Sequence, residues 1–165
     1  MQFVPPVSRN IDLDEFLARP LFAHLATASD DGARDSPVWY LWEERYLWTL
    51  GNRQSDTFPK RLLAEPRCSY GIVDFRPEIG YLQHVGFRGT ATIVPVNIAR
   101  AVRLIRRYVR PEVDLRNLWF ASDIEEVDPE TSDTIFVRFQ PDTAVARDLS
   151  YSIDGRALRG AAVFR

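Results

Sequence analysis

The chain has 165 residues, of which 45% are hydrophobic and 27% charged, a composition typical of a soluble globular protein. This length fits a single domain that buries about 70% of the surface its unfolded chain exposes. The formal net charge of −2 gives no reason to expect nucleic acid or an anionic membrane as a partner.

The first ten residues, MQFVPPVSRN, contain two adjacent prolines and predict an extended arm. They lack the charged region and apolar run of a signal peptide. No window of about 18 apolar residues is present, so no membrane span is expected. We therefore expect a cytoplasmic protein.

Three strands joined by short turns are predicted in the first third of the chain. Asp12 or Asp14 can cap a short helix before them, which Pro20 ends. The segment LFAHLATAS alternates as a strand and is followed by Asp-Asp-Gly, a strong hairpin signal. SPVWYLW reads as one returning strand, and residues 43–45 form a polar turn before the strand 46–50. This order predicts a β-meander, in which His24 has a structural role.

A polar turn over residues 51–56 and a short helix over 57–64 come next, with Asp56 or Thr57 as the helix N-cap. Lys60 and Arg61 in the first helical turn oppose the helix dipole, at a cost of roughly 0.3–1 kcal/mol each. Their placement makes sense if an anion binds at the helix start. The alternative is that both side chains point into water and that Arg53 is an ordinary turn residue. The residues alone leave both interpretations open.

The second half begins with the strand CSYGIVDF, in which the single cysteine, Cys68, is expected to be a buried, inert thiol. With one cysteine, an intrachain disulfide and a cysteine-based zinc site are excluded, and no metal site is expected. A long strand follows over 81–94, where Gly86 and Gly89 suggest a bend or a close approach by another group.

A helix is predicted over residues 98–109, with apolar positions at helical spacing and arginines on the remaining surface. That surface could meet nucleic acid, but the acidic total favours a solvated or subunit-facing helix. Residues 111–133 are acidic and irregular, with a short helix near 118–121. The strand 134–139 turns at Pro141-Asp142 into a strand over 143–146, and a tail covers 149–165. Six or seven antiparallel strands with inserted helices predict a mainly β, Greek-key-like small barrel in one domain, 1–165.

In this order and spacing the motifs resemble the pyridoxamine 5′-phosphate oxidase-like flavoproteins. The resemblance covers residues 14–148 and rests on LAT, the Asp-Gly hairpin, SPVWY, a strand ending in WT, a helix ending in EPR, and VGFRGTA. It implies a split β-barrel that forms a homodimer, with two FMN molecules in clefts at the subunit interface.

The resemblance also implies where FMN would lie. The flavin ring and ribityl chain would face Ser36, Pro37, Val38, Trp39, Trp48 and Thr49. The phosphate would meet Arg53, Ser55, Thr57, Lys60 and Arg61, and His84 sits where the family often has a polar side chain reaching the flavin. A structural role for His84 is a close alternative.

The sequence departs from the family at three points. Thr57 and Phe58 replace its usual Arg-Lys pair, and Ser36 and Leu41 stand where true pyridoxamine phosphate oxidases have basic residues. The tail lacks the Trp and His of the pyridoxal phosphate site. We therefore expect an FMN-dependent oxidoreductase acting on another small molecule. The alternatives are a deazaflavin-dependent reductase on the same fold, or a protein that binds flavin or haem without turnover.

Overall fold

The computed structural model describes residues 1–4 and 11–152. Expectations for the Pro5-Pro6 segment and for the tail beyond residue 152 lie outside these residues. The strands are β1 (Gln2–Phe3), β2 (Ala23–Ser29), β3 (Gly32–Val38), β4 (Leu41–Glu43), β5 (Tyr46–Asn52), β6 (Arg67–Arg76), β7 (Tyr81–Pro95) and β8 (Thr134–Asp148). The α-helices are α1 (Leu13–Leu17), α2 (Phe58–Ala64) and α3 (Ile98–Tyr108), and the 3₁₀ helices are η1 (Pro77–Ile79) and η2 (Leu115–Asn117).

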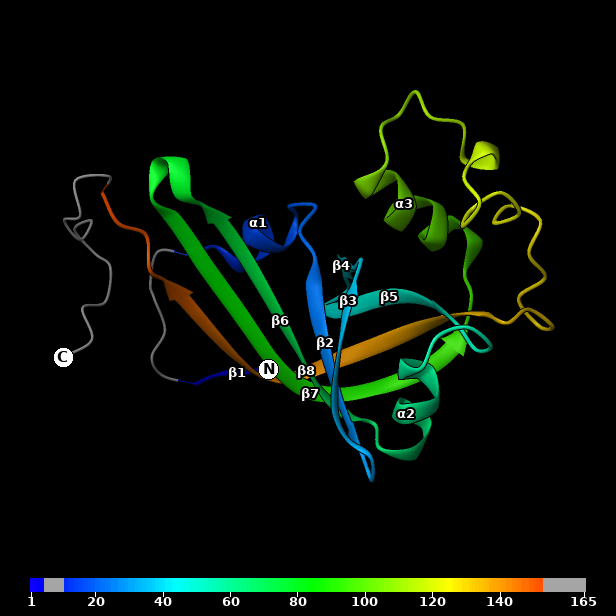
Figure 1. Ribbon diagram of the computed structural model, residues 1–165, viewed down its shortest axis with the longest axis horizontal. Coiled ribbons are helices and arrows are strands. Elements are labelled where there is room, and N and C mark those ends of the chain that lie inside the picture. The colour runs from blue at the N-terminus through cyan, green and yellow to red at the C-terminus, as the bar shows by residue number, and fades with distance from the viewer. Residues whose placement is uncertain (5–10, 153–165) are drawn as a thin grey trace.

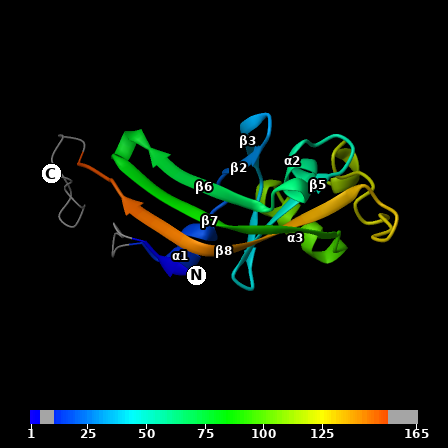
Figure 2. The ribbon, with the colours of Figure 1, turned by 90° about the horizontal axis from the view of Figure 1, so that it is seen from below.

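The strands form one sheet in the order β3-β2-β6-β7-β8-β5-β4, and all neighbours in this path are antiparallel. The two outermost strands, β3 and β4, are consecutive in the chain and are joined through Trp39 and Tyr40. The sheet must therefore curl until its edges meet, which makes a barrel. β6, β7 and β8 extend beyond the barrel side by side (Figure 2). The predicted mainly β split barrel is confirmed.

The predicted β-meander is wrong. SPVWYLW is two strands: β3 ends at Val38 and pairs with β2, whereas β4 begins at Leu41 and pairs with β5. Alternation continues across the break, so hydrophobic pattern alone cannot reveal it. At this break the chain crosses from β3, at one edge of the sheet, to β4, at the other edge.

Hydrophobic side chains form two separate clusters. The first fills the barrel and includes Leu25, Leu47 and Phe139, while α2 adds Phe58 from one end (Figure 1). The second lies between α3 and the outer surface of β5 and β8, and includes Trp48. Because successive side chains of a strand point to opposite faces, β5 contributes side chains to both clusters.

The predicted helices are confirmed with small shifts. Asp12 caps α1 by accepting a hydrogen bond from the Glu15 N–H at 2.9 Å, and Asn97 caps α3 by accepting one from Arg100 at 2.9 Å. The predicted position of a short helix near 118–121 is wrong: the 3₁₀ helix η2 begins three residues earlier and covers Leu115–Asn117.

The predicted turn at Pro141-Asp142 is also wrong, since β8 continues through it. A register shift opposite Arg88 and Gly89 absorbs the extra residue. Pro141 lies buried at this irregularity, where its missing N–H removes no regular ladder bond. The close approach predicted at Gly89 is confirmed: a Cβ there would lie 2.0 Å from the Gln140 carbonyl oxygen.

At the other end of the molecule, β1 runs parallel to β8, with Gln2 opposite Thr143. The expected N-terminal arm is thus paired over residues 2–3, although its side chains stay exposed. In the described part of the chain, no helix is long and apolar enough to cross a membrane.

Candidate functional site

The turn between β5 and α2 is braced by its own side chains. Asn52 Oδ1 accepts hydrogen bonds from the N–H groups of Gln54 at 2.9 Å and Ser55 at 3.1 Å. The Asp56 carboxylate accepts from the Asn52 N–H at 2.7 Å. The predicted cap by Asp56 or Thr57 is therefore wrong in its chemistry: Thr57 occupies the N-cap position, but its side chain forms no capping bond.

Two cations and two hydroxyl groups are nevertheless exposed around this turn. Arg53 and Lys60 lie on the surface, and within the described chain neither side chain forms an ion pair or hydrogen bond. Ser55 and Thr57 are exposed beside them. The structure thus gathers four of the five predicted phosphate residues within one turn and the start of α2.

Arg61, the fifth, points away from solvent. Its side chain is 8% exposed and forms an ion pair with Asp31. Its Nε donates to Thr27 Oγ1 at 3.0 Å, and its Nη2 donates to the Gly32 carbonyl. Together with Ser29, which contributes most, Arg61 lowers the pKa of the Asp31 carboxyl. Arg61 therefore fastens α2 to the β2–β3 hairpin, which argues against a direct role in holding phosphate.

The residues predicted to face the flavin ring divide between the faces of the sheet. Val38 and Thr49 point into the barrel, where Thr49 Oγ1 lies 3.1 Å from Tyr70 Oη. Pro37 is exposed and Ser36 half-buried. A ligand outside the barrel could therefore meet Val38 and Thr49 only through their backbone.

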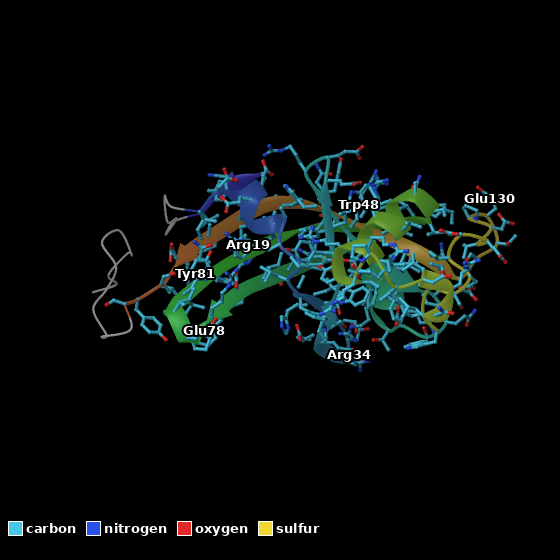
Figure 3. All side chains as sticks on the ribbon, turned by 90° about the horizontal axis from the view of Figure 1, so that it is seen from above. Arg19, Arg34, Trp48, Glu78, Tyr81 and Glu130 are labelled. Carbon is cyan, nitrogen blue, oxygen red and sulfur yellow. The ribbon has the colours of Figure 1, made fainter. Side chains whose placement is uncertain are left out.

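The two tryptophans of this set lie outside the barrel. Trp39 is half-buried and stacks on Tyr108 with ring centroids 4.7 Å apart. Trp48, labelled in Figure 3, packs in the cluster under α3. Arg100 Cζ lies 3.7 Å from its ring centroid. This guanidinium occupies the face of Trp48, so Trp39 is the more accessible ring of the two.

His84 lies in a separate hollow of about 350 Å³ on the outer face of β6, β7 and β8. Burial, followed by the charge of Arg147, lowers the pKa of the His84 imidazole. Both causes favour the neutral form of the ring. Among the residues that the structure describes, those around the hollow include Arg88 and Arg147 and no carboxylate.

Two glycines form the floor of this hollow. Gly71 pairs with Gly86 across β6 and β7, and a Cβ at Gly71 would meet nothing within 4 Å. Gly71 was not predicted from the sequence as part of a site. Its position alternates with the buried side chains of β6, which places it on the outer face.

The structure does not bring His84 to the turn in the same chain. α2 lies beside β7 at Ala91, whose N–H donates to the Pro66 carbonyl at 2.9 Å. His84 precedes Ala91 by seven residues, which is roughly 23 Å of extended strand. One flavin could contact both regions only if a second copy of the chain supplied one of them.

The arginines of α3 are engaged within the protein. Arg100 and Arg103 pair with Glu43 at 3.0 and 2.8 Å, and Arg106 and Arg107 donate to backbone carbonyls. Each of these four arginines thus has a partner within the chain. In the described chain, no group of three or more His, Cys, Asp or Glu side chains could hold a metal ion.

No family model matches the sequence, and no curated protein matches it. Solved structures do resemble this fold. A conserved hypothetical protein from Mycobacterium tuberculosis has a TM-score of 0.65 and is 21% identical, over 90% of each chain. An F420 reductase has a TM-score of 0.56 and is 23% identical, over 79% of this chain and 94% of its own. An FAD-binding protein from Mesorhizobium loti has a TM-score of 0.57 and is 17% identical, over 85% of this chain and 96% of its own.

A candidate pyridoxamine 5′-phosphate oxidase from Listeria innocua is also similar, with a TM-score of 0.58 and 12% identity over 81% of this chain and 94% of its own. A haem storage protein from Vibrio cholerae has a TM-score of 0.59 and 15% identity, over 84% of this chain and 93% of its own. At these identities the likeness establishes the split-barrel fold.

Proposed function

We propose that this chain is an FMN-dependent oxidoreductase of the pyridoxamine 5′-phosphate oxidase-like class, acting on a small molecule other than pyridoxamine phosphate. The observation that carries the proposal is the exposed turn 53–60 on a split barrel, where Arg53 and Lys60 have no protein partner in the described chain. The similar structures include an F420 reductase and an FAD-binding protein, which supports a flavin as the class of ligand.

In this proposal Arg53 and Lys60 hold the phosphate, with hydroxyl hydrogen bonds from Ser55 and Thr57. An FMN phosphate carries close to two negative charges, so charge-assisted hydrogen bonds from these cations are favourable. The ring lies along Ser36–Trp39, where the exposed Pro37 and the half-buried Trp39 offer an apolar edge. FMN itself supplies the hydride or electron transfer.

The site is completed by a second copy of the chain. His84 lies far from the turn along β7, so its contribution to the same flavin requires the partner's outer sheet face. The neutral imidazole can donate or accept one hydrogen bond without adding charge beside the flavin. A homodimer with FMN at the subunit interface joins the two regions.

A deazaflavin-dependent reductase is the second candidate, and one observation favours it. Five backbone N–H groups of the turn, those of residues 52 to 56, already have protein acceptors. They are not free to bind phosphate, and the family's Arg-Lys pair is absent. A weakly held, exchanging cofactor would be consistent with this turn.

Replacing Arg53 and Lys60 together by alanine tests the proposal. Each lost charge-assisted bond is worth about 1.5–3 kcal/mol, so FMN affinity should fall at least tenfold while the unfolding midpoint stays unchanged. FMN binding is followed by flavin fluorescence quenching on the purified protein. Arg116→Ala, which removes an exposed arginine outside the proposed site, is the matched control.

Unchanged FMN affinity in the double variant would contradict the phosphate assignment. A wild-type protein that binds no FMN but is active with reduced deazaflavin would shift the proposal to the second candidate.

A further inference from the structure

Five aromatic rings from separate parts of the chain form one continuous series beside α3. Phe22 lies 6.2 Å from Tyr108, which stacks on Trp39 at 4.7 Å. Trp39 meets Phe120 edge-to-face at 5.5 Å, and Phe120 meets Trp119 in the same way at 5.7 Å. We refer to these five side chains as the aromatic platform. The proposed flavin site uses only Trp39.

The inner part of the platform is held rigidly. The Trp39 and Tyr108 rings are parallel to within 3°. The Tyr108 hydroxyl donates to the Leu21 carbonyl at 2.8 Å and accepts from the Tyr40 N–H at 3.1 Å. Both rings are half-buried, so their orientation is fixed before any ligand arrives.

The two outer rings, Trp119 and Phe120, are exposed to solvent although the turn that carries them is folded. Trp119 is 90% exposed and Phe120 39%. The chain beside them is anchored: Ala121 and Ile124 are buried in the cluster under α3, and the Ala121 N–H donates to the Leu118 carbonyl at 2.9 Å. A tryptophan buries 150–250 Å² when covered, so leaving it in water in an ordered turn forgoes substantial stabilisation. Phe22, at the other end of the series, is also 55% exposed, and a group of exposed aromatic rings of this kind is a feature of surfaces that meet another molecule.

The segment that carries Trp119 and Phe120 is strongly negative. Residues 111–133 contain eight acidic residues and one basic residue, Arg116, which gives a charge of 1 − 8 = −7. Arg116 is itself paired with Asp114 at 2.6 Å. Figure 3 shows Glu130 at the outlying end of this segment. At the inner end of the platform a cation is already present, since Arg107 Cζ lies 5.9 Å over the Tyr108 ring. Around the outer rings, Trp119 and Phe120, the excess of carboxylates in their own segment favours cations over anions.

We propose that the aromatic platform binds a planar aromatic cation. Stacking on Trp119, which is 90% exposed, would supply the contact; Phe120 is turned 87° to that ring and does not stack on the same planar molecule. A positive charge over the aromatic face is attracted by the ring as well as by the acidic segment. Neutral planar molecules keep only the stacking, and anionic ones are opposed by charge.

The platform adjoins the flavin site of the proposed oxidoreductase, and this relation rests on the proposed function. Trp39 belongs both to the platform and to the segment 36–39 along which the flavin ring lies. A molecule stacked on Trp119 would therefore be separated from the flavin by the Phe120 and Trp39 rings, which lie 5.5 Å apart. The binding itself requires no flavin, so it can be measured separately.

Three acridines of matched shape and different charge test the inference on the purified full-length chain. N-methylacridinium is a cation, acridine is neutral near pH 8, and acridine-9-carboxylate is an anion. Binding is followed by quenching of tryptophan emission and by calorimetry at 50 and 300 mM salt. We expect the cation to bind at least tenfold more tightly than the anion, with a difference that shrinks at high salt.

Trp119→Ala should weaken N-methylacridinium binding about tenfold, because stacking on one aromatic side chain contributes on this scale. Trp119→Phe should restore most of the affinity. The combined Asp123→Asn, Glu125→Gln and Glu126→Gln variant should reduce the preference for the cation over the anion. Leu63→Ala, which removes an apolar side chain that is 66% exposed on α2, is the matched control and should change nothing.

Tighter binding of the anion, or equal binding of the cation by wild type and Trp119→Ala, would overturn the inference. FMN affinity is measured in parallel on each variant. If FMN binds but no acridine does, the platform assignment fails and the proposed function stands. If the acridinium binds but FMN does not, the platform assignment stands and the proposed function fails.

Discussion

Arg61 illustrates how one buried cation can hold three elements together. Its guanidinium reaches Thr27 of β2, Asp31 of the hairpin and the Gly32 carbonyl of β3 from its position on α2. Thr27 is only 2% exposed, so the loss of its donor would leave a buried hydroxyl without that partner. Lys60, one residue earlier, points into solvent and makes none of these contacts.

We predict that Arg61→Ala lowers the free energy of unfolding by about 2 kcal/mol, since it removes several hydrogen bonds from a buried site. Urea denaturation at pH 7 measures the change. Lys60→Ala is the control and should stay within about 0.5 kcal/mol of wild type. Equal stability of the two variants would show that the buried contacts contribute little. FMN affinity of a still-folded Arg61→Lys variant should be close to that of wild type.

At the scale of the elements, the irregularity between β7 and β8 fixes the bend of the two longest strands. Gly89 faces the Gln140 carbonyl so closely that a Cβ would lie 2.0 Å from that oxygen. Backbone on one side and the Phe139 ring on the other leave nothing flexible enough to move aside. The bend requires glycine at this position for reasons of space.

We predict that Gly89→Ala destabilises the protein by about 3 kcal/mol or more, because the strands must separate to admit the methyl group. Gly71→Ala is the matched control on the neighbouring strand: its Cβ would meet nothing within 4 Å, and alanine costs less backbone entropy than glycine. Gly71→Ala should therefore fold with unchanged or slightly higher stability. Thermal unfolding followed by circular dichroism compares them, and similar losses for both would refute the argument.

The elements that could be predicted from the sequence are those with local signals. The β2–β3 hairpin follows from Gly32, which adopts φ +102°, and α3 follows from its apolar spacing and Asn97. The break at Trp39 and Tyr40 could not be predicted, because residues on both sides alternate in the same way and only pairing with distant strands separates them. The continuity of β8 was hidden for a similar reason: Pro141 resembles a turn until its position at a bulge is known.

The candidate site likewise has features that local sequence signals predict and features that depend on distant parts of the chain. Exposure of Arg53 and Lys60 agrees with their polar turn, whereas the burial of Arg61 depends on a hairpin thirty residues earlier in the chain. The orientation of Val38 and Thr49 into the barrel follows from strand alternation once the closure is known. The distance of His84 from the turn depends on the length of β7, which no local pattern specifies.

At the scale of the whole molecule, the outer face of β2, β6 and β7 has features of a protein–protein interface. Small residues lie opposite each other at its centre, Ala26 with Ser69 and Gly71 with Gly86, and the longer His84 and Arg88 lie beside them on β7. Exposed apolar side chains border it, among them Val73 at 45% and Phe75 at 53%. A face of this kind suits an isologous contact, in which the same patch of two copies meets.

We predict a homodimer formed through this face, with a mass near 38 kDa (2 × 19.0 kDa) by light scattering. Gly71→Arg places a long cation in the open space over the floor, so the chain should fold normally but remain monomeric. Its FMN affinity should also fall, because His84 of the partner subunit would no longer reach the flavin. Leu63→Arg introduces the same charge on α2, away from the face, and should stay dimeric. A wild-type monomer of 19.0 kDa that retains FMN would refute both the interface and the composite site.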